Sequence, residues 1–130
     1  MNSNAHRKKI SCGIIGYPLN KPRSIPIWKK YIKKHKINAK MHSFEIKPNS
    51  FSKFIEKIKN EHNFLAMAVT MPYKKKILKY LNELDTFAKK TSSVNLVVKR
   101  KKKLFGYNTD IFGASECIKK KIKKYQNIII

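Results

Sequence analysis

Acidic residues and arginine are scarce in this 130-residue chain. Only 7 residues are Asp or Glu, against 31 that are Lys or Arg, so the formal net charge is +24. Three of the basic residues are arginine (Arg7, Arg23 and Arg100), and the lysines are spread over the whole chain. Specific phosphate and base recognition relies on arginine forks. We therefore expect no specific nucleic-acid partner, only loose, salt-sensitive binding to polyanions.

Glycine is too rare to form a phosphate-binding loop. The chain has 4 glycines, and they do not form the closely spaced set whose backbone wraps around the phosphates of a dinucleotide. We therefore expect no cofactor-binding residues in this chain.

Cysteine and long apolar runs are scarce as well. Cys12 and Cys117 lie far apart, and no cysteine or histidine spacing is typical of a metal site, so two reduced thiols and no metal are expected. The polar start, Met1 to Lys9, precedes only a short apolar run, which is typical of neither a signal peptide nor a membrane span. These features predict a cytoplasmic protein with no membrane partner.

Short apolar runs alternate with amphipathic stretches, as expected for one domain. Strands are predicted at 10–16, 39–46, 64–69, 94–98 and 103–107, the last two forming a hairpin. Helices are predicted at 24–36, from 48–50 onward, and at 75–80, 85–90 and 110–124. In the last helix we expect the apolar residues to face inward (Ile111, Ala114, Ile118 and Ile122). This alternation predicts an α/β fold, a three-layer α/β/α sandwich with a mostly parallel sheet.

Polar segments follow three of the predicted strands, at 16–24, 69–74 and 106–110. In open α/β sheets, ligands bind at the carboxyl ends of strands. Lys74 and Asp110 are the ionisable pair in these segments that could exchange a proton with a ligand, the carboxylate holding the lysine in place. Two simpler interpretations stay open: Lys74 could be a solvated member of the lysine run 74–76, and Asp110 could only cap the last helix.

Four blocks follow one another along the chain: Gly16-Tyr-Pro-Leu-Asn-Lys-Pro-Arg-Ser-Ile25, Ala68-Val-Thr-Met-Pro-Tyr-Lys74, Ser92-Ser-Val-Asn-Leu96 and Gly106-Tyr-Asn-Thr-Asp-Ile-Phe-Gly113. In order and spacing they resemble the signature of the shikimate dehydrogenase family. That signature reads G-x-P-I-x-H-S-x-S-P, N-V-T-x-P-x-K, G-A-V-N-T and G-x-N-T-D-x-x-G. The resemblance spans about residues 10 to 130 and implies the N-terminal, substrate-binding and catalytic domain of that family.

The resemblance also implies an activity and a role for each matching residue. Ser24 and Thr70 would bind the substrate carboxylate. Lys74 would be the catalytic lysine, paired with Asp110, and Asn95 and Asp110 would hydrogen-bond the ring hydroxyls. The implied reaction is the NADP-linked interconversion of 3-dehydroshikimate and shikimate, in the biosynthesis of chorismate and aromatic amino acids. The implied ligand is a small polyhydroxylated carboxylate.

Several positions depart from the family signature. Pro22 stands where the signature has its first serine, Lys21 where it has histidine, Ala68 where it has asparagine and Leu96 where it has the last threonine. The catalytic pair is retained while the pocket is altered. The alternative is therefore a non-catalytic or divergent paralogue that binds another small hydroxy-acid.

The resemblance also divides the chain. Residues 1–9 would be a polar tail, 10–126 the substrate-binding catalytic domain, and 127–130 the start of a truncated Rossmann domain for NADP. We expect this chain alone, without that cofactor domain, not to catalyse the reaction.

Overall fold

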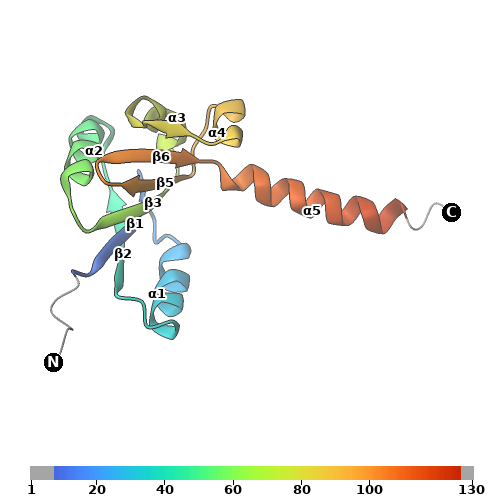
Figure 1. The fold of residues 1–130 in the computed structure, drawn as a ribbon, viewed down its shortest axis with the longest axis horizontal. Coiled ribbons are helices and arrows are strands. Elements are labelled where there is room, and N and C mark those ends of the chain that lie inside the picture. The colour runs from blue at the N-terminus through green and yellow to red at the C-terminus, as the bar shows by residue number, and fades with distance from the viewer. Residues whose placement is uncertain (1–7, 127–130) are drawn as a thin grey trace.

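A computed structural model describes residues 8–126 and consists of one six-stranded sheet with helices around it (Figure 1). The strands are β1 (Ile10–Gly16), β2 (Ala39–Glu45), β3 (Phe64–Val69), β4 (Glu83–Leu84), β5 (Leu96–Arg100) and β6 (Lys103–Tyr107). The helices are α1 (Ser24–Lys34), α2 (Phe51–Asn60), α3 (Tyr73–Lys76), α4 (Thr86–Thr91) and α5 (Thr109–Gln126), with 3-10 turns η1 (Pro48–Ser50) and η2 (Ile77–Tyr80). The predicted tail 1–9 lies mostly outside the described residues, and the predicted strand 127–130 lies wholly outside them.

The strands are arranged in the order β2-β1-β3-β5-β6-β4. β1 pairs in parallel with β2 and β3, and β4 in parallel with β6, whereas β5 is antiparallel to both of its neighbours. Only β5 therefore runs against the others, which confirms the predicted mostly parallel sheet. β4 carries no signal in the sequence, because its two residues are too few to show a period of two.

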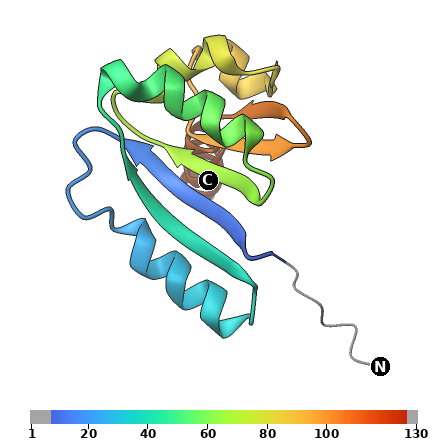
Figure 2. The ribbon, with the colours of Figure 1, turned by 90° about the vertical axis from the view of Figure 1, so that its left-hand side faces the viewer.

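Helices cover both faces of the sheet, which confirms the predicted three layers. α1 lies on one face, and α2, α3 and α4 lie on the other (Figures 1 and 2). The core fills the α2 side, where Phe51, Ile55 and Ile58 of α2 are buried, and the rings of Phe51 and Tyr73 stack with centroids 4.1 Å apart. In contrast, α1 buries none of its residues.

The prediction that the apolar residues of the last helix face inward is wrong for α5. It begins at the end of β6 and projects away from the sheet (Figure 1). The residues expected to face inward are exposed, at 40% for Ile111, 58% for Ile118 and 49% for Ile122, and Ala114 is exposed too. A periodic apolar stripe shows that a helix has a face suited to burial. It does not say which element would cover that face, and no element of residues 8–126 does.

The helix after β3 begins earlier than predicted and changes type. The prediction was one helix over 75–80, whereas α3 starts at Tyr73 and continues as the 3-10 turn η2. Tyr73 is fully buried, so tertiary packing places the first helical residue in the core. The short lysine-rich stretch carried too little apolar periodicity to indicate this start.

Residues 8–126 were also compared with the requirements of a membrane-spanning helix and of a metal site. No helix among residues 8–126 is long and apolar enough to span a membrane. In the same part of the chain, no group of three His, Cys, Asp or Glu side chains could hold a metal ion. Cys12 and Cys117 are both free thiols.

Candidate active site

The turn that follows β3 carries two of the predicted site residues. The backbone N–H of Thr70 donates to the carbonyl of Ile15 at 2.9 Å, and the carbonyl of Thr70 accepts from the N–H of Tyr73 at 2.9 Å. The Tyr73 hydroxyl donates to the carbonyl of Ile46. Burial raises the pKa of the Tyr73 hydroxyl, and nearby Tyr17 adds to the effect, so the group keeps the proton that it donates. The backbone of Lys74 therefore belongs to a turn that is held against the core.

Asn95 lies where the segment before β5 passes between two other strands. Its N–H donates to the carbonyl of Tyr107 at 3.0 Å, and its carbonyl accepts from the N–H of Val69 at 2.8 Å. The N–H of the preceding Val94 donates to the carbonyl of Lys74 at 2.9 Å. The backbones of Lys74 and Asn95 are thus held at the same edge of the sheet, where β3 and β6 end.

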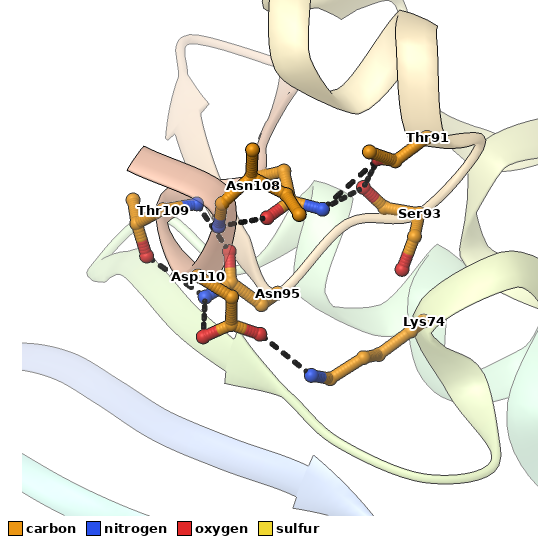
Figure 3. A network of polar contacts seen from close by, with 8 residues as sticks. Lys74, Thr91, Ser93, Asn95, Asn108, Thr109 and Asp110 are labelled. Atoms are coloured by element: carbon orange, nitrogen blue, oxygen red, sulfur yellow. Dashed lines mark hydrogen bonds and ion pairs between the residues drawn. The ribbon is translucent and has the colours of Figure 1, made fainter. Parts of the chain in front are cut away.

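Lys74 and Asp110 form an ion pair across this edge. The ammonium nitrogen Nζ of Lys74 lies 2.7 Å from Oδ2 of Asp110, although the two residues are 36 positions apart in sequence (Figure 3). Their side chains are 36% and 57% exposed. An ion pair this exposed contributes only about 0–1 kcal/mol to folding stability. It therefore does little for the fold and is open to a ligand.

Asn95 and Thr109 complete a small polar cluster around Asp110. The Nδ2 group of Asn95 donates to Oγ1 of Thr109 at 2.8 Å and to Oδ1 of Asp110 at 2.9 Å. Its Oδ1 accepts from the backbone N–H of Thr109 at 2.8 Å (Figure 3). Both amide hydrogens of Asn95 are thereby used within the protein. In this arrangement the amide can still accept a hydrogen bond at Oδ1, which has a second lone pair, but has none left to donate.

The loop before α1, which leads to Ser24, is held by contacts other than those of this cluster. The loop is held by its backbone: Tyr17 N–H donates to the carbonyl of Met71 at 3.1 Å, and Leu19 N–H donates to Oε2 of Glu45 at 2.7 Å. Ser24 begins α1, and its hydroxyl oxygen is shielded from solvent without a hydrogen-bond partner. Buried hydroxyls are normally paired, so the Ser24 hydroxyl is an exception among the described residues.

The structure brings three of the five predicted residues into direct polar contact: Lys74, Asn95 and Asp110. Thr70 lies in the same turn as Lys74, and a side-chain carbon of Thr70 lies only 2.5 Å from where a Cβ on Gly16 would stand. The absence of a side chain at Gly16 therefore lets the end of β1 meet this turn. No hydrogen bond connects Ser24 to the cluster within the described part of the chain.

Two neighbours of Asp110 were missed by reasoning from sequence. Thr109 forms two hydrogen bonds with the side chain of Asn95. Asn108 is only 5% exposed and forms hydrogen bonds with several elements. Both stand in the fourth sequence block, beside Asp110. Their position in that block was the available signal, but neither side chain is ionisable, so nothing in their chemistry marks them as proton-exchanging groups.

The glycines of the described chain do not form a dinucleotide site. Gly13 and Gly16 lie in β1, Gly106 lies in β6, and Gly113 lies inside α5. A dinucleotide pyrophosphate requires a glycine-rich turn from a strand into a helix N-terminus. Residues 8–126 contain no such turn, so they do not fit NADP.

The chain is similar to known proteins over most of its length. Residues 14–97 match the family described as shikimate dehydrogenase substrate binding domain. A protein of Halothermothrix orenii named shikimate dehydrogenase (NADP(+)) is 39% identical over 101 residues, which are 78% of this chain and 35% of that protein. A protein of the same name from Methanococcus vannielii is 32% identical over 120 residues, 92% of this chain and 42% of that protein.

Solved structures agree with these relatives. Shikimate dehydrogenase 1 from Peptoclostridium difficile is similar with a TM-score of 0.78 at 34% identity, covering 85% of this chain and 40% of that one. Shikimate dehydrogenase from Aquifex aeolicus is similar with a TM-score of 0.80 at 30% identity, covering 88% and 43%. This chain thus spans roughly two fifths of the length of the proteins it matches.

Proposed function

This chain belongs to the shikimate dehydrogenase family, and from that premise we propose that it binds a shikimate-like hydroxy-acid and supplies the proton-exchanging groups of an NADP-linked dehydrogenase. The single observation that carries the proposal is the Lys74–Asp110 ion pair, with Nζ and Oδ2 2.7 Å apart, at the edge of the sheet where β3 and β6 end. Such a pair contributes little to folding, and it offers a proton donor and an acceptor to a bound alcohol or ketone.

The chemistry of the pair follows from its charges. In the direction of ketone reduction, the Lys74 ammonium donates a proton to the carbonyl oxygen as that oxygen becomes a hydroxyl. In the direction of alcohol oxidation, the hydroxyl returns the proton to the Lys74 amine. Asp110 holds the ammonium in place and stabilises its charge in both directions. The relatives carry NADP(+) in their names; when bound, the cofactor would exchange a hydride with the substrate carbon, donating it in the reduced form and accepting it in the oxidised form, but residues 8–126 offer it no site.

The remaining predicted residues fit the other groups of such a substrate. Ser24 and Thr70 are the proposed donors to the carboxylate, and the unpaired hydroxyl of Ser24 supports this role. Asp110 and Oδ1 of Asn95 are the proposed acceptors for the neighbouring ring hydroxyls. Because the amide hydrogens of Asn95 are already used, we assign it acceptance only.

The division of the chain remains part of this proposal. Residues 10–126 would be the substrate-binding catalytic domain, with NADP held by polypeptide outside the described residues. A reducing, cytoplasmic location is supported by the two free thiols, Cys12 and Cys117.

The altered positions support a second candidate, a paralogue that binds a different small hydroxy-acid. Pro22 and Ala68 cannot offer the side-chain hydrogen bonds of the serine and asparagine found in the family signature, and Leu96 replaces a hydroxyl. The Lys74–Asp110 chemistry would be the same for either substrate.

The test is to titrate the 130-residue chain with shikimate and to monitor the titration by NMR. We expect saturable shifts in the amides of Lys74, Asn95 and Asp110. Lys74→Met should weaken shikimate binding about 10- to 150-fold, the equivalent of roughly 1.5–3 kcal/mol for a hydrogen bond to a charged group.

The matched control is Lys119→Met, which breaks the exposed Lys119–Glu116 pair (3.1 Å) on α5. It should leave the shikimate affinity unchanged. If shikimate causes no saturable shifts and another hydroxy-acid of similar size does, the second candidate replaces the first. Equal binding by the wild type and Lys74→Met would remove Lys74 from the site.

A further inference from the structure

Asn108 lies at the junction between β6 and α5 and is one of three buried polar residues in the described chain. Its Nδ2 group donates to Oγ1 of Thr91 and to the carbonyl of Ser93, both at 3.0 Å. Its Oδ1 accepts from the backbone N–H of Ile111 at 3.2 Å (Figure 3). Both amide hydrogens and the oxygen are therefore used, and the side chain connects the end of α4 to the first turn of α5.

The backbone of Asn108 is held from another side. Its N–H donates to Oδ1 of Asp85 at 3.2 Å, and the same carboxylate oxygen accepts from the N–H of Ala88 at 2.7 Å, which caps the start of α4. Asn108 is thus attached to both ends of α4. Because these partners are part-buried, water competes with them less than it does with the Lys74–Asp110 pair.

Three successive residues hold three parts of the candidate site. The carbonyl of Ser93 accepts from Asn108, the N–H of Val94 donates to the carbonyl of Lys74, and the side chain of Asn95 bonds Asp110. The segment 93–95 is therefore the common support of the lysine and of the helix that carries the carboxylate. Asn108 joins this helix to the segment by part-buried hydrogen bonds, whereas the bonds of the Asn95 side chain to Thr109 and Asp110 are exposed.

The rest of α5 cannot supply this positioning. From Asp110 to Ala114 every residue is exposed, and the helix projects from the domain (Figure 1). An exposed ion pair is too weak to set the direction of a helix that lacks a packed face. The direction of α5, and with it the location of the Asp110 carboxylate, is set in the first turn, where Asn108 caps the helix.

We propose that Asn108 is a positioning residue that aims Asp110 at Lys74 by tying the start of α5 to Thr91 and Ser93. The inference deepens the proposed function of the same site. The Asn108 side chain acts by positioning Asp110 and does not need to contact the substrate. Loss of Asn108 should free the first turn of α5 and loosen the Asn95–Asp110 contact, while the sheet stays intact.

The first experiment needs no ligand. We compare the wild type with Asn108→Ala by NMR hydrogen exchange of the Asn95 side-chain amide and of the Val97 backbone amide in the centre of the sheet. We expect exchange at Asn95 to speed up about tenfold or more through local opening, with little change at Val97. Unchanged protection of Asn95, or equal acceleration at both groups, would overturn the proposal.

The matched control is Asn82→Ala. Asn82 is also an asparagine whose Oδ1 accepts from a part-buried backbone N–H, that of Leu104 at 2.9 Å, but it does not touch the cluster. It should leave exchange at Asn95 unchanged. If Asn108→Ala fails to fold, Thr91→Val is the milder variant: it removes one acceptor of Asn108 and leaves the Ser93 carbonyl, so it should loosen Asn95 in the same direction but less. An unchanged Asn95 in folded Thr91→Val would overturn the proposal.

The second readout is shikimate affinity, which we expect Asn108→Ala to weaken about tenfold and Asn82→Ala to leave unaltered. The two readouts separate the two proposals. If the wild type does not bind shikimate, the proposed function fails, and the exchange comparison still decides the role of Asn108. If binding holds in Asn108→Ala while Lys74→Met abolishes it, the positioning role fails and the function stands.

Discussion

Ala68 in β3 and Leu96 in β5 are direct cross-strand partners in the antiparallel pairing of these strands. They are also two of the positions that depart from the family signature. Both line an apolar hollow of about 240 Å³ between α1 and the sheet. The two departures are therefore linked, because a polar side chain at one position alone would face an apolar partner.

This pairing predicts that the two positions must be restored together. The double variant Ala68→Asn, Leu96→Thr should bind shikimate about 2- to 12-fold more tightly than the wild type, the equivalent of about 0.5–1.5 kcal/mol for a regained hydrogen bond. Ala68→Asn alone should gain less and lose stability. Calorimetric titration of the wild type, Ala68→Asn and the double variant with shikimate measures the three affinities. A double variant that binds no better would favour the second candidate substrate.

Ser24→Ala should separate binding from stability. The Ser24 hydroxyl is buried without a partner, so its removal should leave the free energy of unfolding unchanged or raise it by up to about 1 kcal/mol. Shikimate affinity should fall about tenfold or more, because a donor to the carboxylate is lost. Urea denaturation and titration of the same samples test both parts. A clear loss of stability would mean that the hydroxyl has a structural partner.

Two glycines should respond to alanine in opposite directions. A Cβ at Gly106 would lie 2.5 Å from Leu81 and 2.9 Å from both Leu84 and Val94, so Gly106→Ala should cost about 1–3 kcal/mol through overpacking. A Cβ at Gly113 would meet nothing within 4 Å. Gly113→Ala should therefore stabilise α5 by about 0.5–1 kcal/mol. Thermal unfolding of both variants checks the prediction, and a neutral Gly106→Ala would contradict the packing described for β6.

Lys99 should make stability depend on pH in the alkaline range. Its Nζ is buried and donates to the carbonyls of Ile58 and Glu61 at 3.0 and 2.5 Å, at the end of α2. Burial lowers the pKa of this ammonium from 10.5; Glu61 opposes the shift and Lys102 adds to it. Between the lowered pKa and 10.5 the unfolded chain binds more protons, so the contribution of Lys99 to stability rises with pH.

Lys99→Met removes both this titration and the donor to the two carbonyls. At neutral pH the variant should be less stable by about 1–3 kcal/mol, because the two carbonyls lose their charged donor and keep only the backbone N–H groups of Glu61 and Phe64. The stability gap between wild type and variant should widen as the pH approaches 10.5. Urea denaturation at several alkaline pH values measures the gap, and comparison within one pair of proteins cancels the other lysines. If the stability gap instead narrowed with rising pH, the pKa of Lys99 would be raised in the folded protein and not lowered.

The sequence by itself determined the local elements whose signal is local. The predicted strands 10–16, 64–69 and 103–107 agree with β1, β3 and β6 to the residue, because a continuous or alternating apolar run bounded by polar residues reports directly on burial. The sequence blocks also indicated the family and selected Lys74 and Asp110.

Only the tertiary structure decided what lies beside what. The β5–β6 hairpin was predicted and is confirmed, but the antiparallel pairing of β5 with β3, the parallel strand β4 and the exposure of α5 depend on how distant segments pack, which no local period records. The Lys74–Asp110 contact joins residues 36 positions apart. Asn108 gave no sequence signal of its own, because a buried asparagine and a solvated one are the same letter. The difference lies in whether Thr91, Ser93 and Ile111 are brought within hydrogen-bonding distance, and only the packing of α4 against the start of α5 does that.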